Sequence, residues 1–424
     1  MRQTLLVPST TIAPGRRRLV YGVGGIGLGT NALVLFLVPL RAHELGMSLA
    51  AIGVLLGVKS IVEAVLSVPV GAFIGRVGAR QGLIIGSFGV ALSGAAFLVT
   101  SSALWLFAIQ VLLGVLRPMA WIGGQMYAAG MRSKEFHGRD TARFSFGANV
   151  GQMVTPLGAG LLVEYSGTRA AFVGMTVYGL VFMLVSLLMP DIARSAGKKG
   201  GDRTGFVAAL RLLRLPSIRV DLLLTFVRLW LPTTWSSFLP VYLVSVGTSA
   251  VVAGSVSTSM ALVSTLVSLL AGWVVKLGTP TVMTTLVLGI SAVGVVVTPL
   301  LTDVPWVYLS AVLVGIGQGL SLPLLLVMVN QSAPPDLRAL ALGLRASVNQ
   351  AGATLSPVIT GALIAVSSLG VGFAVSGALA GAIVLGAGML HRHNARTGTH
   401  DGDEPEEPGP APDPSGPSPR TSAG

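Results

Sequence analysis

Residues 69–86 read PVGAFIGRVGARQGLIIG and set two arginines, Arg76 and Arg80, among glycines between two long apolar runs. Charged residues make up only 10% of the chain, whereas a soluble domain carries roughly a quarter. The 424 residues are 52% hydrophobic and their mean hydropathy is +0.79. A membrane helix needs about 20 apolar residues, and the chain has many runs of that length. We therefore expect an integral membrane protein, with these arginines in a short polar loop between two spans.

The apolar runs and their polar breaks predict twelve membrane-spanning helices. The first six lie near 19–40, 50–74, 83–100, 103–130, 143–166 and 169–190. The second six lie near 220–245, 250–275, 281–300, 304–330, 343–366 and 369–390. We expect an all-α polytopic membrane protein whose bundles comprise residues 19–190 and 220–391, joined by a cytoplasmic loop at 191–219. Residues 1–18 are expected to be a cytoplasmic segment, and the Pro-, Gly- and acid-rich residues 392–424 a disordered cytoplasmic tail.

The distribution of Lys and Arg predicts the sidedness of the chain. Cytoplasmic loops of membrane proteins are enriched in these residues. They fill alternate gaps, Arg338 and Arg345 among them, and the central stretch, whereas the opposite gaps hold only Arg41 and Arg169. We therefore expect a multi-pass protein of the cell membrane with both termini in the cytoplasm. The net charge of +12 then reflects topology and contact with anionic lipids, and does not indicate a nucleic-acid partner.

A displacement of 201 residues relates the two halves of the sequence. LVPLRAHELGMSLAAIG (37–53) corresponds to FLPVYLVSVGTSAVVAG (238–254), and GQMVTPLGAG (151–160) corresponds to GATLSPVITG (352–361). The matched positions of the second pair are Gly151 and Gly352, Thr155 and Ser356, Pro156 and Pro357, and Gly160 and Gly361. Two pseudo-symmetric parallel halves are the architecture of a transporter whose halves rock around a substrate site near the membrane midplane.

The stretch GAFIGRVGAR (71–80) resembles the loop motif G-x-L-a-D-R-x-G-R-[KR] between the second and third helices of the major facilitator superfamily. The matching positions are Gly71, Arg76, Gly78 and Arg80. Gly75 stands where the family has Asp. Glycines let the chain turn tightly and let helices approach closely. We expect the arginines to bond carbonyl ends and acidic groups of neighbouring helices and so to latch the cytoplasmic gate.

Residues 151–160 also resemble the antiporter motif of the family's fifth helix, G-x-x-x-G-P-x-x-G-G, with Thr155 and Ala159 in place of two glycines. In the family this motif marks drug and metabolite exporters that exchange with protons. The resemblance covers nearly the whole chain up to about residue 391. It implies a twelve-helix transporter of the exporter-like branch.

Four ionisable side chains lie deep in the predicted spans: Lys59, Glu63, Arg117 and Arg228. Such a group costs about 2.5–3.5 kcal/mol on insertion scales and should therefore face a cavity or a partner. Lys59 and Glu63 lie four residues apart and share a helix face. Either Glu63 carries a coupling proton in concert with Lys59, or the two form an ion pair that only lets both charges sit in the membrane.

Gln110, Gly114, Arg117 and Trp121 lie on one face of the predicted helix 103–130. We expect a cavity wall there, with Arg117 binding an anionic or hydrogen-bonding part of the substrate and Trp121 stacking on an aromatic part. The alternative is an Arg117–Glu63 pair with a structural or gating role. Further candidates for substrate contact are Arg228, Trp235, Asn31, Gln318 and Asn349. An Arg228–Asp221 pair is an alternative for the first of these, and the amides are as well suited to bonding neighbouring helices.

Together these features predict a secondary active transporter that moves a small amphipathic organic molecule by alternating access, in proton-coupled efflux. We expect a monomer whose partners are a small-molecule substrate, protons and the lipid bilayer, with no cofactor or metal. The chain has no cysteine and no P-loop, which excludes thiolate sites and a nucleotide-driven pump. An intramembrane enzyme would need a deep catalytic constellation that we do not find in the sequence. Uptake of a metabolite and a transport-inactive sensor of the same fold stay open as alternatives.

Overall fold

The computed structural model describes residues 14–99, 102–130, 137–189, 213, 215–301, 303–332 and 338–397. The N-terminal half contains α1 (Pro14–Glu44), α2 (Leu49–Val77), α3 (Ala79–Leu98), α4 (Ala103–Gly130) and α5 (His137–Leu188). The C-terminal half contains α7 (Pro216–Ser245), α8 (Ala250–Ser268), α9 (Ala271–Val274), α10 (Pro280–Val297), the 3-10 turn η2 (Thr298–Leu300), α11 (Val304–Ser332), α12 (Arg338–Ala365) and α13 (Leu369–Thr397).

The long element α5 comprises two spans, because Gly167 breaks it with φ 80° and ψ 166°. Counting α5 twice gives twelve long helices in the described chain, so the predicted fold class is confirmed. By length and composition alone, nine segments of the described chain can cross a membrane, and the 43-residue segment within α5 holds both of its spans.

The predicted limits of the polar segments were partly wrong. Helix α1 already begins at Pro14, α7 at Pro216, and α13 runs on to Thr397, into the tail expected to be disordered. Each residue added to an existing helix adds a backbone hydrogen bond, so a helix can continue beyond the end of its apolar run. The rest of the segments 1–18, 191–219 and 392–424 lies outside the described residues.

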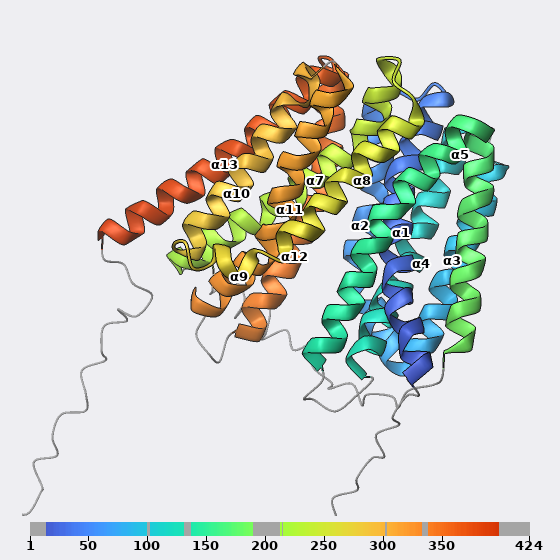
Figure 1. Cartoon of the computed structure of the whole chain (residues 1–424), viewed down its shortest axis with the longest axis horizontal. Coiled ribbons are helices and arrows are strands. Elements are labelled where there is room, and N and C mark those ends of the chain that lie inside the picture. The colour runs from blue at the N-terminus through green and yellow to red at the C-terminus, as the bar shows by residue number, and fades with distance from the viewer. Residues whose placement is uncertain are drawn as a thin grey trace, which may run out of the picture.

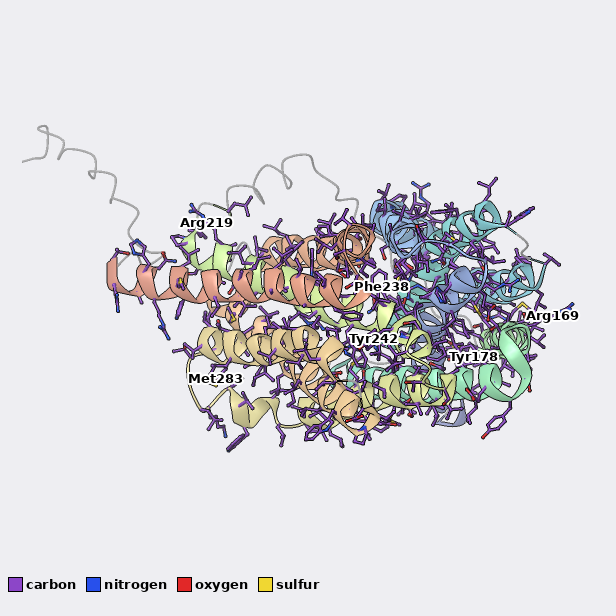
Figure 2. All side chains as sticks on the ribbon, turned by 90° about the horizontal axis from the view of Figure 1, so that it is seen from above. Arg169, Tyr178, Arg219, Phe238, Tyr242 and Met283 are labelled. Carbon is purple, nitrogen blue, oxygen red and sulfur yellow. The ribbon has the colours of Figure 1, made fainter. Side chains whose placement is uncertain are left out.

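The two halves form separate bundles that meet at one end and diverge toward the other (Figure 1). Between them α5 packs against α8, and α2 packs against α12. We call the end that carries the starts of α2 and α8 the junction face, and the end that carries the starts of α1 and α7 the diverging face. Seen from above, Arg169 and Met283 lie at opposite ends of the molecule, whereas Phe238 and Tyr242 of α7 lie near its middle (Figure 2).

The 201-residue repeat is reproduced in the packing. At several glycines an added Cβ would run into a carbonyl oxygen of another helix, and three of these contacts recur at this displacement. The recurring pairs are Gly114 with Lys59 and Gly315 with Met260, Gly151 with Gly25 and Gly352 with Phe226, and Gly53 with Pro357 and Gly254 with Pro156. Both members of each pair are displaced by 201, so the repeated positions are those where backbones touch.

The turns leading into α2 and α8 repeat in the same way. Gly46 and Gly247 both have positive φ, 75° and 84°, which glycine adopts without the penalty that a Cβ brings. Two residues later Ser48 and Ser249 accept hydrogen bonds from backbone N–H groups of the first helical turn. These serine caps fix where the helices that join the bundles begin.

Candidate functional site: the hollow and charge cluster between the helices

A small cavity of about 30 Å³, which we call the hollow, lies between the two bundles. Its lining comes from four helices: Ala32, Leu35 and Phe36 of α1, Gln152 and Pro156 of α5, Ser236 of α7, and Ser257, Met260 and Ala261 of α8. The lining is mostly apolar with a few hydroxyls and one amide, and none of these side chains carries a charge. Small-molecule sites share this mostly apolar lining and commonly lie at domain interfaces.

The joint between α5 and α8 is built from the predicted helix 5 motif. A Cβ on Gly160 would strike the carbonyl of Ala250, and a Cβ on Gly254 would strike that of Pro156. Backbones can approach this closely only because the side chains are absent. The other motif residues pack within the N-terminal bundle, where Thr155 donates to the carbonyl of Gly29 over 3.2 Å.

The same joint recurs between α2 and α12. A Cβ on Gly53 would strike the carbonyl of Pro357 and lie 2.8 Å from the Cα of Gly361. Ser356, the repeat mate of Thr155, is fully buried. Pro156, Gly160, Pro357 and Gly361 therefore all belong to the contact between the bundles, whereas Gly151 and Gly352 pack inside them.

Two polar contacts across the joint were not predicted. The backbone N–H of Ala250, at the start of α8, donates to Oε2 of Glu164 on α5 over 2.8 Å. The hydroxyl of Thr258 on α8 donates to the carbonyl of Met153 over 2.6 Å. A carboxylate at a helix start is favoured by the unpaired N–H groups and the helix dipole. Glu164 near the end of a predicted span was the one sequence signal for this contact.

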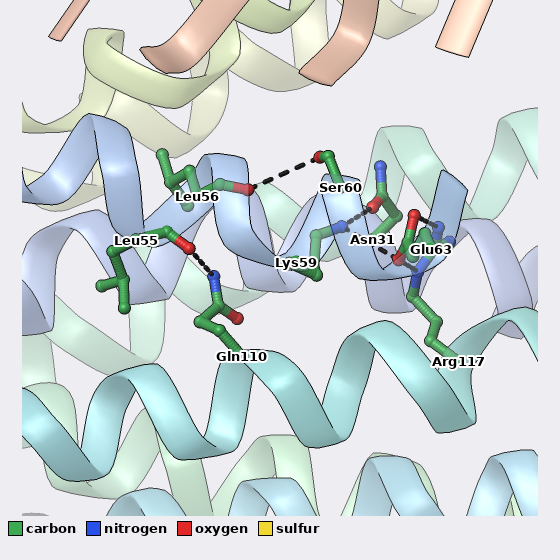
Figure 3. Close-up of polar contacts among 8 residues, drawn as sticks. All are labelled: Asn31, Leu55, Leu56, Lys59, Ser60, Glu63, Gln110 and Arg117. Atoms are coloured by element: carbon green, nitrogen blue, oxygen red, sulfur yellow. Dashed lines mark hydrogen bonds and ion pairs between the residues drawn. The ribbon is translucent and has the colours of Figure 1, made fainter. Parts of the chain in front are cut away.

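The deep charges of the N-terminal bundle form one cluster (Figure 3). Arg117 of α4 donates from Nε to Oε1 of Glu63 and from Nη2 to Oε2, both over 2.7 Å. Lys59 lies 3.4 Å from the same carboxylate and donates to Oδ1 of Asn31 over 2.9 Å. Lys59 and Glu63 are only 3% and 8% exposed. The shared helix face of these two residues and the Arg117–Glu63 alternative are therefore both present.

The predicted cavity wall on α4 is not formed in this structure. Gln110 is fully buried and donates to the carbonyl of Leu55 over 3.4 Å, and Gly114 packs against α2. Trp121 lies against Gly27 of α1. This face therefore packs on α1 and α2 and does not line the hollow. A guanidinium is desolvated at less cost beside a carboxylate that takes both of its donors than beside an uncharged wall.

The candidates of the C-terminal bundle are spread over its interior. Arg228 donates from Nη1 to Oδ1 of Asn349 over 3.1 Å. Trp235 is fully buried and donates to Oγ of Ser310 over 3.3 Å, so it fills the core and does not line the hollow. Gln318 of α11 has a buried Oε1 with no hydrogen-bond partner among the described residues. Nowhere in the described ranges do three His, Asp or Glu side chains come together as metal ligands would.

The loop motif at the diverging face shows two of its expected features. Gly78 joins α2 to α3 with φ 102°, and Arg80 donates to the carbonyl of Leu187 at the end of α5 over 2.8 Å. Arg76 is exposed. The expected close helix approach at Gly71 is wrong for this conformation, because a Cβ there would meet nothing within 4 Å.

A sequence family described as Major Facilitator Superfamily matches residues 19–357 and 236–422. The chain belongs to the major facilitator superfamily. A curated relative, the inner membrane transport protein YajR of Escherichia coli (strain K12), is 26% identical over 192 residues, which are 44% of this chain. The chain spans 35% of the length of that relative.

Solved structures of superfamily transporters share the fold over nearly the whole chain. A point mutant of the nucleoside transporter NupG superposes with a TM-score of 0.74 at 14% identity, covering 88% of this chain and 99% of NupG. A bacterial homologue of the human lysosomal transporter Spinster, inward-facing and unoccupied, superposes with a TM-score of 0.72 at 16% identity, covering 91% and 98%. A D-xylose–proton symporter gives 0.68 at 15% identity, covering 89% and 97%.

Proposed function

We propose that this superfamily member is a secondary active transporter that exports a small amphipathic organic molecule in exchange for protons. The observation that carries the proposal is the one-sided closure of the hollow. Glycine–carbonyl contacts between α5 and α8 and between α2 and α12 hold the bundles together at the junction face, while the bundles diverge at the opposite face. A site that opens to one side at a time is the requirement of alternating access.

Charge supports an inward-open assignment for this conformation. Arg76 and Arg80 lie at the diverging face, whereas Arg41 and Arg169 are the basic residues of the loops at the junction face. Because positive charge is retained on the cytoplasmic side, we place the diverging face in the cytoplasm and the junction face outside the cell membrane. The hollow is then poised to take substrate from the cytoplasm.

Glu63 is our candidate for the coupling group. Burial favours a neutral carboxyl, whereas the two cations beside Glu63 favour the charged form, so a proton can bind only as these ion pairs loosen. Lys59 and Glu63 lie on α2 and Arg117 on α4, and α2 also contributes to the joint with α12. Proton binding would thereby change the ion pairs that hold α2, and the contacts of α2 with α12 help to close the junction face. Pro156 and Gly160, which match the antiporter motif, lie in the corresponding joint between α5 and α8 and favour export.

The test is proton flux in inside-out membrane vesicles with an acidified lumen, challenged with lipophilic drugs and organic anions. We expect a compound to discharge the gradient through the wild type and not through Glu63→Gln. The control Glu44→Gln removes an exposed carboxylate at the end of α1 and should behave as the wild type. Substrate movement without any proton release would replace exchange by facilitated transport, and binding without flux would indicate a sensor.

A further inference from the structure

The C-terminal bundle brings two guanidinium groups together between α7 and α12. Arg228 lies on α7 and Arg345 on α12, and these helices pack against each other. Arg345 is close enough to act on Arg228 as a like charge. From the sequence we expected Arg345 among the loop cations, but it lies two turns inside α12 and is half-buried.

Three donor atoms of these arginines are unused in the described ranges. Nε of Arg228, and Nε and Nη1 of Arg345, are buried and have no hydrogen-bond partner within the described part of the chain. Arg228 donates one hydrogen bond, to the neutral amide of Asn349. In the other bundle Arg117 gives two donors to one carboxylate. Among the described residues, no carboxylate takes a hydrogen bond from Arg228 or Arg345, whereas a buried guanidinium normally has such a partner.

The local charge balance is positive. Along α7, α11 and α12 the sequence has a single acidic residue, Asp221, whose charge acts on Arg345. One carboxylate cannot neutralise two guanidiniums, so about one positive charge stays uncompensated in a medium where ions are costly. A partner that supplies the missing negative charge would bind most favourably at this place.

The shared framework of the two halves does not require these arginines. The residues 201 positions earlier are Gly27 for Arg228 and Phe144 for Arg345. The glycines and prolines that make the helix contacts do recur at this displacement. Residues that depart from this shared packing are more simply explained by a function specific to one half.

We propose that Arg228, Arg345 and Asn349 bind the carboxylate of a singly charged amphipathic organic anion. The inference rests on the proposed transport function and gives its substrate a chemical class. Ser236, which lines the hollow, lies eight residues beyond Arg228 on α7, a rise of about 12 Å. An anion held at the arginines can thus extend its apolar body toward the uncharged lining of Phe36 and Met260.

The experiment measures thermal unfolding of the full chain in detergent with 4-phenylbutyrate and with its neutral amide, at constant ionic strength. We expect the carboxylate, and not the amide, to raise the Tm of the wild type. Arg228→Gln and Arg345→Gln should each weaken this binding at least tenfold, which corresponds to about 1.4 kcal/mol. The control Arg219→Gln removes an exposed arginine at the start of α7 and should bind as the wild type (Figure 2).

A second readout covers variants whose fold is affected. Because Arg228 is a buried cation without a carboxylate, Arg228→Gln should unfold without ligand at the same or a higher Tm than the wild type. Equal stabilisation by amide and carboxylate, unchanged binding in both glutamine variants, no stabilisation by the carboxylate, or a marked fall in the ligand-free Tm would each overturn the proposal. Binding is measured on the wild type without a proton gradient, so failure of proton exchange leaves this result standing.

Discussion

A methyl group at Gly160 should open the junction face. A Cβ added there would lie 3.1 Å from the carbonyl carbon of Ala250 and closer still to its oxygen, whereas ordinary contact begins at 3.4 Å. Since backbone on both sides forms this contact, no side chain can swing aside to relieve it. Gly160→Ala must therefore push α5 and α8 apart wherever the joint is closed.

The size of the effect follows from the cost of overpacking, which is typically about 1–3 kcal/mol. This cost falls on the closed joint, because the contact is made only when the bundles meet there. A difference of about 1–3 kcal/mol between two conformations changes their ratio by roughly 5–150-fold. We therefore expect Gly160→Ala to shift the population toward a junction face that is open.

The chain is suited to measuring this shift because it has no native cysteine. Spin labels on Ser102→Cys and Asp303→Cys would report the separation of the two bundles, since both residues are exposed at the junction face. The distance distribution should gain a longer component in Gly160→Ala. Gly158→Ala is the matched control, two residues away on α5, where a Cβ would meet nothing within 4 Å. Equal distributions in Gly160→Ala and the wild type, or the same change in Gly158→Ala, would refute the reasoning.

Two further predictions concern stability. Glu63→Gln leaves Arg117 and a neighbouring cation buried without a carboxylate and should lower the free energy of unfolding by about 3–5 kcal/mol, whereas adding Arg117→Met should restore part of the loss. A double-mutant cycle of unfolding in detergent measures the coupling between Glu63 and Arg117, and additive losses would contradict their ion pair. In Gly78→Ala a residue with a side chain must adopt a φ of 102°, which should lower the free energy of unfolding by about 1–3 kcal/mol. Gly75→Ala lies in a helix with open space around it and should leave the unfolding free energy unchanged in the same experiment.

The repeat in the sequence predicted more of the structure than any single motif. Pro156, Gly160, Pro357 and Gly361 were matched by displacement alone, and the structure places all of them in the contact between the bundles. Positions where two backbones touch tolerate only small residues, and such positions leave a recognisable pattern in sequence. Helix number and order followed in the same way from the length of the apolar runs.

The partners of the deep charges could not be read from the sequence. The spacing of Lys59 and Glu63 fixes their common face, but which neighbouring helix presents Arg117 to that face depends on how α2 and α4 pack. Arg345 was misassigned because a cation two turns into a helix looks, in sequence, like one in the preceding loop. Gly71 was expected at a close contact, but a Cβ there would meet nothing within 4 Å.

The joint between the bundles has a property of self-complementary surfaces. The N-terminal bundle presents Gly53 to Pro357 of the C-terminal bundle, and it also carries Pro156, the repeat mate of Pro357. The C-terminal bundle likewise presents Gly254, the repeat mate of Gly53, to Pro156. The same pair of positions therefore makes contact twice, once with each partner coming from the opposite bundle, as in an isologous dimer. Either six-helix half thus carries both surfaces of the joint, and a pair of identical halves would possess every backbone contact needed to dock.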